Sequence, residues 1–227
     1  VKETGDVNQL SISNNGDSHV FIHTGDIVKG GKQDRTIAQD VIIAPGAKNV
    51  PLESFCVEQG RWQKREGEEL SRFGSNDKML SSRKLKMAAR YEKNQGKVWQ
   101  NVQEEQTQLN ENISIINGYD VAVEDTVSET SLQLTLESDE LKKAKKKMEQ
   151  KFVSILKDNE TAIGYAYAIN GEIYGVDIYN NKKLFNALWD KIAESIMTES
   201  VSNRNEEDLK SANKSDVVLF MEAIDTK

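Results

Sequence analysis

The stretch Thr161–Asn181, TAIGYAYAINGEIYGVDIYNN, decides the fold class, because two strand-like runs flank a tight-turn dipeptide. Asn170-Gly171 is that dipeptide, and Asn-Gly between alternating apolar residues is the strongest short-range signal for a β-hairpin. A two-residue turn places Ile169 opposite Glu172, and this pairing sets the register of the whole hairpin. The stretch therefore predicts an antiparallel pair of strands.

A regular register predicts two unequal faces for this hairpin. One face carries large side chains, Tyr165 and Tyr167 among them, whereas the other is nearly bare and carries Asp177 directly opposite Gly164. A bare face allows a helix, another backbone or a ligand to come close. Both interpretations stay open from the residues alone, and Asp177 is the carboxylate that a ligand would meet.

Helical patterns flank the hairpin on both sides. Ser138 starts an amphipathic helix, another begins near Asn180-Asn181, and VVLFMEAI (217–224) is typical of a final strand. Short strands punctuated by turns fill residues 1–62, and helical spacing dominates 77–110, with Gln95 on the apolar stripe one turn before Trp99. Residues 111–137 favour a loop with one short strand near 113–116.

These segments predict a single α+β domain over residues 1–227. Its parts are an antiparallel β-rich N-terminal part (1–62), a helical middle (77–110) and a C-terminal helix-hairpin-helix-strand layer (138–225).

Composition excludes several function classes. The net charge of −7 argues against nucleic acid as a partner. The sequence contains no run of about 18 apolar residues, so it predicts no membrane-spanning helix. The lone Cys56 excludes an internal disulfide and a cysteine-based zinc site, and His19 and His23 lie roughly 13 Å apart on a strand, too far to share a metal. We predict no metal and no cofactor. The chain begins at Val1, so we expect either a cytoplasmic protein or an exported one whose leader has been removed.

Three short motifs concentrate polar and aromatic residues. They are GKQDR (31–35), CVEQGRW (56–62) and QGKVW (95–99). With these motifs and the hairpin, the chain resembles, from about residue 10 to 200, an uncharacterised bacterial family, the "ARG and rhodanese-phosphatase-superfamily-associated" domain, in which ARG means ADP-ribosylglycohydrolase. The resemblance implies an association with proteins of ADP-ribose and NAD metabolism, without implying a mechanism.

Three hypotheses compete for the motifs. Cys56 could be a nucleophile activated by Arg35 or Arg61, although no histidine lies in any motif to act as its base. The motifs could form a polar pocket for an anionic or nucleotide-like small molecule, in which Glu58 and Asp34 could also act as paired hydrolytic acids. They could instead form a sealed salt-bridge network, covered by Trp62, in a structural or interaction module. The predicted ligand-binding residues are Lys32, Gln33, Arg35, Cys56, Glu58, Arg61, Trp62, Gln95, Trp99 and Asp177.

Overall fold

A computed structural model describes residues 1–74, 76–121, 130–205 and 210–225. The N-terminal part is a six-stranded antiparallel sheet in the order β1-β2-β7-β5-β4-β8, beside a two-stranded pair, β3 and β6. The strands are β1 (Lys2–Glu3), β2 (Gln9–Ile12), β3 (Val20–Ile22), β4 (Ile27–Gly30), β5 (Arg35–Ile37), β6 (Val41–Ile43), β7 (Val50–Cys56) and β8 (Phe73–Gly74). Their apolar core contains Leu10, Ile37, Ile43 and Leu52. The antiparallel β-rich prediction is confirmed.

The helical middle is interrupted at Lys93 and Asn94. Helix α1 (Arg83–Met87) continues into the π-helical turn η1 (Ala88–Glu92), and α2 (Gln95–Asn117) follows. The break falls at Lys93, which is left-handed at φ 48°, and at Asn94, whose side chain accepts a hydrogen bond from the Lys97 amide and so caps α2. The cap therefore divides the helices just before Gly96.

The strand predicted near residues 113–116 is wrong, because α2 runs through it to Asn117. The β-branched residues there favour a strand locally, yet Ile113 lies one turn after Leu109 on the buried stripe of α2, and burial of that stripe outweighs the local preference. A short helix, α3 (Leu132–Glu137), occupies the end of the predicted loop. Residues 122–129 of that loop lie outside the described residues.

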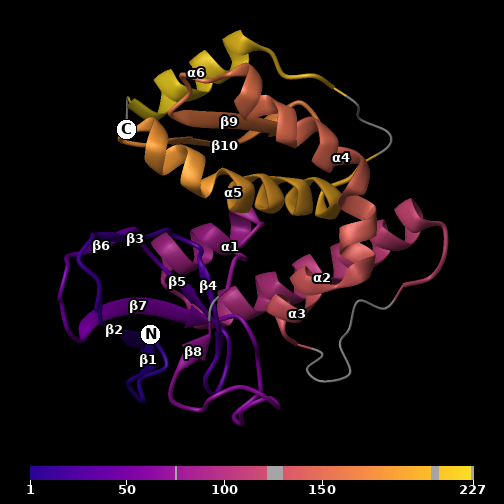
Figure 1. The fold of residues 1–227 in the computed structure, drawn as a ribbon. Helices are drawn as coiled ribbons and strands as arrows, with labels where there is room; N and C mark the ends of the chain where they lie inside the picture. The colour runs from indigo at the N-terminus through magenta and orange to yellow at the C-terminus, as the bar shows by residue number, and fades with distance from the viewer. Residues whose placement is uncertain (75, 122–129, 206–209, 226–227) are drawn as a thin grey trace.

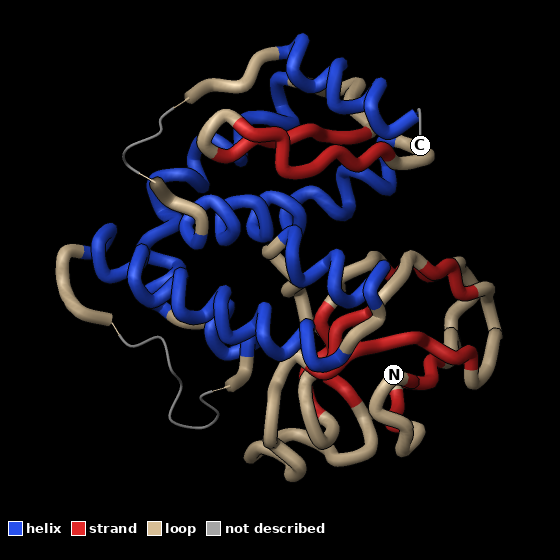
Figure 2. The backbone as a smooth tube through the Cα atoms, turned by 180° about the vertical axis from the view of Figure 1, so that it is seen from behind, coloured by secondary structure: helices blue, strands red, loops and turns tan. Residues whose placement is uncertain are grey.

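The C-terminal layer contains α4 (Asp139–Asp158), the hairpin strands β9 (Gly164–Ile169) and β10 (Glu172–Ile178), α5 (Lys182–Ser202) and α6 (Lys214–Asp225). Figures 1 and 2 show the hairpin between α5 and α6. Ser138 and Asn181 cap α4 and α5 as predicted, with side chains that accept hydrogen bonds from Leu141 and Leu184.

The final strand predicted for VVLFMEAI is wrong, since these residues belong to helix α6. The Asn213 side chain accepts hydrogen bonds from the Ser215 and Asp216 amides, as a residue preceding a helix does. The helix packs on β10, so the apolar run covers the hairpin instead of extending the sheet. The structure remains α+β.

The hairpin turn is as predicted, but the register beyond it is not. Asn170 and Gly171 both have positive φ, at 52° and 85°, and Ile169 pairs with Glu172. A β-bulge between Ile173 and Gly175 then shifts the pairing by one residue. Asp177 consequently pairs with Tyr165 instead of Gly164. Because opposed residues share a face, the bulge transfers Asp177 and Gly175 to the tyrosine face.

Candidate functional site

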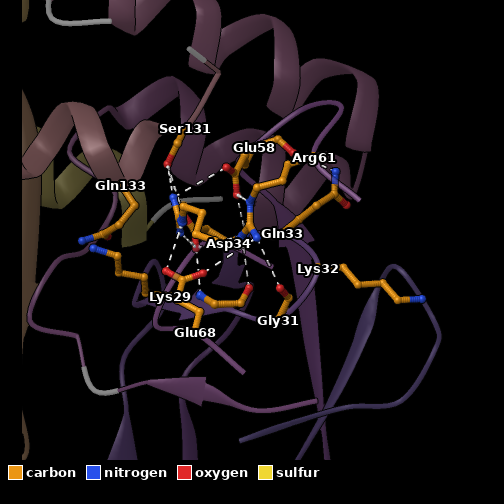
Figure 3. Close-up of polar contacts among 12 residues, drawn as sticks. Lys29, Gly31, Lys32, Gln33, Asp34, Glu58, Arg61, Glu68, Ser131 and Gln133 are labelled. Carbon is orange, nitrogen blue, oxygen red and sulfur yellow. Dashed lines mark hydrogen bonds and ion pairs between the residues drawn. The ribbon is translucent and has the colours of Figure 1, made fainter. Parts of the chain in front are cut away.

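The GKQDR and CVEQGRW motifs meet in a buried cluster of charged side chains, here called the motif cluster: Asp34, Glu58, Arg61, Arg65 and Glu68. Asp34 follows the tight turn after β4, and the other four come from the segment after β7 (Figure 3). Ser131, the N-cap of α3, reaches the same place and donates to Asp34 Oδ2 over 3.0 Å. The cluster therefore joins two loops and the start of a helix.

Ion pairs connect every member of the motif cluster. Arg61 Nε lies 2.7 Å from Glu58 Oε2, and Arg65 Nη2 lies 2.5 Å from Asp34 Oδ1. Arg65 also contacts Glu58 at 3.6 Å and Glu68 at 3.0 Å, so its guanidinium bridges three carboxylates. Backbone amides complete the network, since Gly30 N donates to Asp34 over 2.9 Å and Asp34 N donates to Glu58 over 3.0 Å.

The centre of the motif cluster is closed to solvent, whereas Glu68 at its edge is 16% exposed and lines a surface pocket. Asp34 and Glu58 are 0% exposed, and the two arginines are buried. Burial raises the pKa of Asp34, the Glu58 charge adds to the rise, and the Arg65 guanidinium opposes it. Asp34 and Glu58, the predicted catalytic acids, are thus brought together but have no open face toward a substrate.

Other predicted site residues lie around the motif cluster without forming one pocket. Gln33 donates to the Glu58 carbonyl over 2.8 Å. Arg35, on β5, instead donates to the Val7 carbonyl over 2.7 Å, away from the acidic pair. Lys32 is exposed and points away from the cluster in Figure 3, and Trp62 is 58% exposed, so it does not cover the network.

Cys56, Gln95 and Trp99 also have separate surroundings. Cys56 is fully buried, its thiol donates to the Glu58 carbonyl, and burial raises its pKa, which is the opposite of what a nucleophile needs. Gln95 accepts from Cys56 N and donates to Cys56 O, both over 2.8 Å, so its amide secures β7 to α2. Trp99 lines a different cavity with Gln59 and Gln103.

Arg65 and Glu68 are the members of the motif cluster that sequence reasoning missed. Both lie in QKREGEE (63–69), outside the three motifs. A detectable signal was the mixture of signs from Glu58 to Glu69, in which Arg61 and Arg65 alternate with carboxylates. Such a charge pattern is common on exposed loops as well, so it does not by itself predict burial.

A second polar region, here called the hairpin cavity, lies between α1–η1 and the β9–β10 hairpin. Its volume is about 150 Å³. Arg83, Lys86 and Arg90 line one wall, and the tyrosines of the hairpin line the other: Tyr165, Tyr167 and Tyr174. The cations are three and four residues apart, which places them on one helical face. Asp177 is the predicted site residue that reaches this cavity.

The cations of the hairpin cavity differ from those of the motif cluster in how they are paired with carboxylates. Among the described residues, Arg83, Lys86 and Arg90 form no ion pair within 4.0 Å. The Arg83 guanidinium lies over the Tyr174 ring, 4.6 Å from its centroid. Lys86 is half-buried, and burial lowers its pKa although nearby carboxylates, led by Glu199, oppose the change.

Hydrogen bonds hold the tyrosine wall in place. Tyr167 donates to Glu199 Oε2 on α5 over 2.5 Å, and the Arg83 amide donates to Glu199 Oε1 over 2.6 Å. Glu199 therefore joins the hairpin to α1. Tyr165 in turn donates to Asp177 Oδ2 over 2.5 Å, across the strand pair that the bulge creates.

Within residues 1–74, 76–121, 130–205 and 210–225, no group of three His, Cys, Asp or Glu side chains has an arrangement that could hold a metal ion. In that same part of the chain, no helix has both the length and the apolar character needed to cross a membrane.

Fold and site together define an α+β protein with an internal carboxylate–guanidinium network and a separate cavity walled by cations and tyrosines. The chain belongs to the family described as the ARG and Rhodanese-Phosphatase-superfamily-associated Protein domain, whose family model matches residues 1–227. The family resemblance expected from the motifs is thereby confirmed. Neither the curated proteins nor the solved structures contain a match to this chain.

Proposed function

We propose that this domain binds a small anionic or nucleotide-like ligand, and that the ligand occupies the hairpin cavity. The observation that carries the proposal is the set of Arg83, Lys86 and Arg90, which line one cavity without an ion-pair partner among the described residues. Guanidinium groups recognise phosphate and carboxylate oxygens through paired hydrogen bonds. An anion entering the cavity could form direct ion pairs with these side chains.

The opposite wall of the cavity favours a ligand with a ring. Tyr165 and Tyr167 lie 6.0 Å apart between ring centroids, and Tyr167 and Tyr174 lie 6.3 Å apart, so three rings tilted to one another line this wall. A flat ring can pack on such a surface while its anionic group meets the helix. Arg90 comes from the π-helical turn η1, and π-helical turns are frequent at functional sites.

A structural role for the motif cluster is favoured by its own contacts. Asp34 and Glu58 are 0% exposed and paired with Arg61 and Arg65, so the cluster supports an interpretation in which it secures the 58–68 segment against β4 and α3. A hydrolase that used these two carboxylates would need access that their burial denies. The ligand-binding proposal accordingly rests on the hairpin cavity alone.

Thermal-shift measurements test the proposal. The compounds are inorganic phosphate, AMP, ADP-ribose and NAD, because the family name links the domain to ARG proteins. We expect AMP or ADP-ribose to raise the melting temperature, because binding to the native state alone stabilises it by mass action. The Arg83→Ala/Arg90→Ala double variant should lose most of this shift.

Lys84→Ala is the matched control, because Lys84 lies on α1, is 69% exposed and forms an ion pair with Glu104 at 3.5 Å. This variant should retain the ligand-induced shift of the wild type. The proposal fails if none of the four compounds shifts the wild-type melting temperature, or if the double variant keeps the full shift.

A further inference from the structure

We infer that the ligand of the hairpin cavity is a phosphate ester of a hydroxyl-bearing sugar, whose hydroxyl groups meet Asp177, Asp40 and His23. This inference rests on the proposed function. It adds the chemical nature of the part of the ligand that lies away from its anionic group. It follows from the mixed charge of the cavity lining, which combines the three cations with two carboxylates, Asp40 and Asp177.

Two groups of the cavity lining can be placed along strand β10. Arg83 lies over Tyr174, which marks the cationic end, and Asp177 lies three residues further along the strand. Three residues of extended chain span about 10 Å. The acidic end is therefore separated from the cation–tyrosine contact by roughly the length of a small phosphorylated sugar.

Asp40 is held at the acidic end by the turn before β4. Its Oδ1 accepts hydrogen bonds from the Thr24 amide over 2.7 Å and from the Thr24 hydroxyl over 2.8 Å. Asp177 is oriented from the other side by the Tyr165 hydroxyl. Both carboxylates are exposed at the cavity, and each has further lone pairs available as acceptors.

His23 adds a buried ring nitrogen to this end of the cavity. The side chain is 7% exposed and lines the cavity, and its Nε2 lies 3.1 Å from the Tyr179 hydroxyl. Its Nδ1 is buried and has no hydrogen-bond partner among the described residues. Burial lowers the pKa of His23, which favours the neutral ring with one donor and one acceptor nitrogen.

Two carboxylates and a neutral imidazole match hydroxyl groups. A sugar hydroxyl both donates and accepts a hydrogen bond, so it can donate to a carboxylate while accepting from the imidazole. A second anion would be repelled at this end. A ligand with phosphate beside Arg83 and hydroxyls beside Asp177 satisfies both ends at once.

Isothermal titration calorimetry with ribose 5-phosphate, 2-deoxyribose 5-phosphate and inorganic phosphate tests the inference. We expect ribose 5-phosphate to bind the wild type about tenfold more tightly than its deoxy analogue, the effect of one lost hydrogen bond to a charged group. In Asp177→Asn and in His23→Ala this ratio should fall toward one. Asp158→Asn, at an exposed site at the end of α4, should keep the wild-type ratio.

The outcomes separate the two proposals. Equal affinity of the wild type for both sugar phosphates overturns the inference and leaves anion binding in place. An unchanged ratio in both Asp177→Asn and His23→Ala also overturns it, provided that their circular dichroism spectra match the wild type. If none of the three compounds binds, the sugar-phosphate inference is overturned. The proposed function is then judged by the thermal-shift experiment with its own four compounds.

Discussion

At the scale of single residues, the motif cluster is held by a balance between desolvation and charge pairing. Asp34 and Glu58 are fully buried carboxylates, and Arg61 and Arg65 supply the opposing charges. Taking such ions out of water costs several kcal/mol each, and close pairing offsets that cost. Removing one arginine would therefore lower the free energy of unfolding more than the loss of one ordinary surface contact would.

We predict that Arg65→Ala destabilises the protein by about 3–5 kcal/mol, the range expected when a buried charge loses its partner. Arg65 is the side chain to remove because its guanidinium contacts Asp34, Glu58 and Glu68. Urea unfolding followed by circular dichroism measures the change in the free energy of unfolding.

Arg72→Ala serves as the control, since Arg72 is 64% exposed and lies 3.9 Å from Glu69. This variant should stay within about 0.5 kcal/mol of the wild type. Equal stability of the two variants would contradict the buried-network interpretation of the motif cluster.

At the scale of secondary-structure elements, the β-bulge in the hairpin assembles one wall of the cavity. It pairs Tyr165 with Asp177 and Tyr167 with Gly175. The Tyr167 ring lies directly over Gly175, which leaves no room for a side chain there. A small residue at 175 is therefore needed for the Tyr167 hydroxyl to reach Glu199.

Gly175→Ala should destabilise the protein by about 1–3 kcal/mol, because its added Cβ would lie 2.6 Å from Tyr167 Cε1 and the ring would have to move. The same movement should weaken AMP-induced thermal stabilisation. Gly74→Ala on β8 is the comparison, since the nearest atom there is the Lys29 carbonyl oxygen at 3.8 Å. If Gly175→Ala is as stable as Gly74→Ala, Tyr167 is not held against the strand as described.

At the scale of the whole molecule, polar contacts connect the helical middle to the C-terminal layer, as the hydrogen bond from the Arg83 amide to Glu199 does. Glu105 on α2 is 3% exposed and accepts a hydrogen bond from the Ser81 hydroxyl over 2.9 Å, and the charge of Glu199 on α5 also acts on it. Burial raises the pKa of Glu105 to about 7, Ser81 opposes the rise, and Glu199 adds to it. We propose that residues 1–227 fold as one domain across this junction.

The raised pKa of Glu105 predicts that stability falls as pH rises from about 4.5 to about 7. In this window the unfolded chain releases the Glu105 proton while the folded protein keeps it, so the folded state binds more protons. The loss is about 3 kcal/mol when complete. Glu105→Gln removes the titration, and it should therefore be more stable than the wild type at pH 8.

Urea unfolding between pH 5 and pH 8 measures this effect as the difference in stability between Glu105→Gln and the wild type. Taking the difference cancels the pH-dependent contributions of other groups, such as Asp34 and Glu199, whose pKa values are raised, and His23, whose pKa is lowered. Glu104→Gln, on the same helix and 42% exposed, controls for loss of a surface charge. A difference that does not change with pH would show that Glu105 titrates normally.

Local chemistry determined much of the fold. The Asn170-Gly171 turn, the caps at Ser138 and Asn181 and the antiparallel N-terminal strands were predictable, because each depends on a few neighbouring residues. The bulge at Tyr174 and the helix at VVLFMEAI were not, because both depend on what packs against them. A strand-like run becomes α6 when its apolar face covers the hairpin.

The sequence by itself determined the family, the α+β class and the residues that carry charge in the motifs. Only the tertiary structure decided that Asp34 and Glu58 are sealed by Arg65, and that Asp177 joins a cavity with Arg83 and Arg90 instead. The physical reason is that burial and pairing between distant segments set the energy of a charge. Residue type and spacing specify which charges exist, but not whether water or a guanidinium surrounds them.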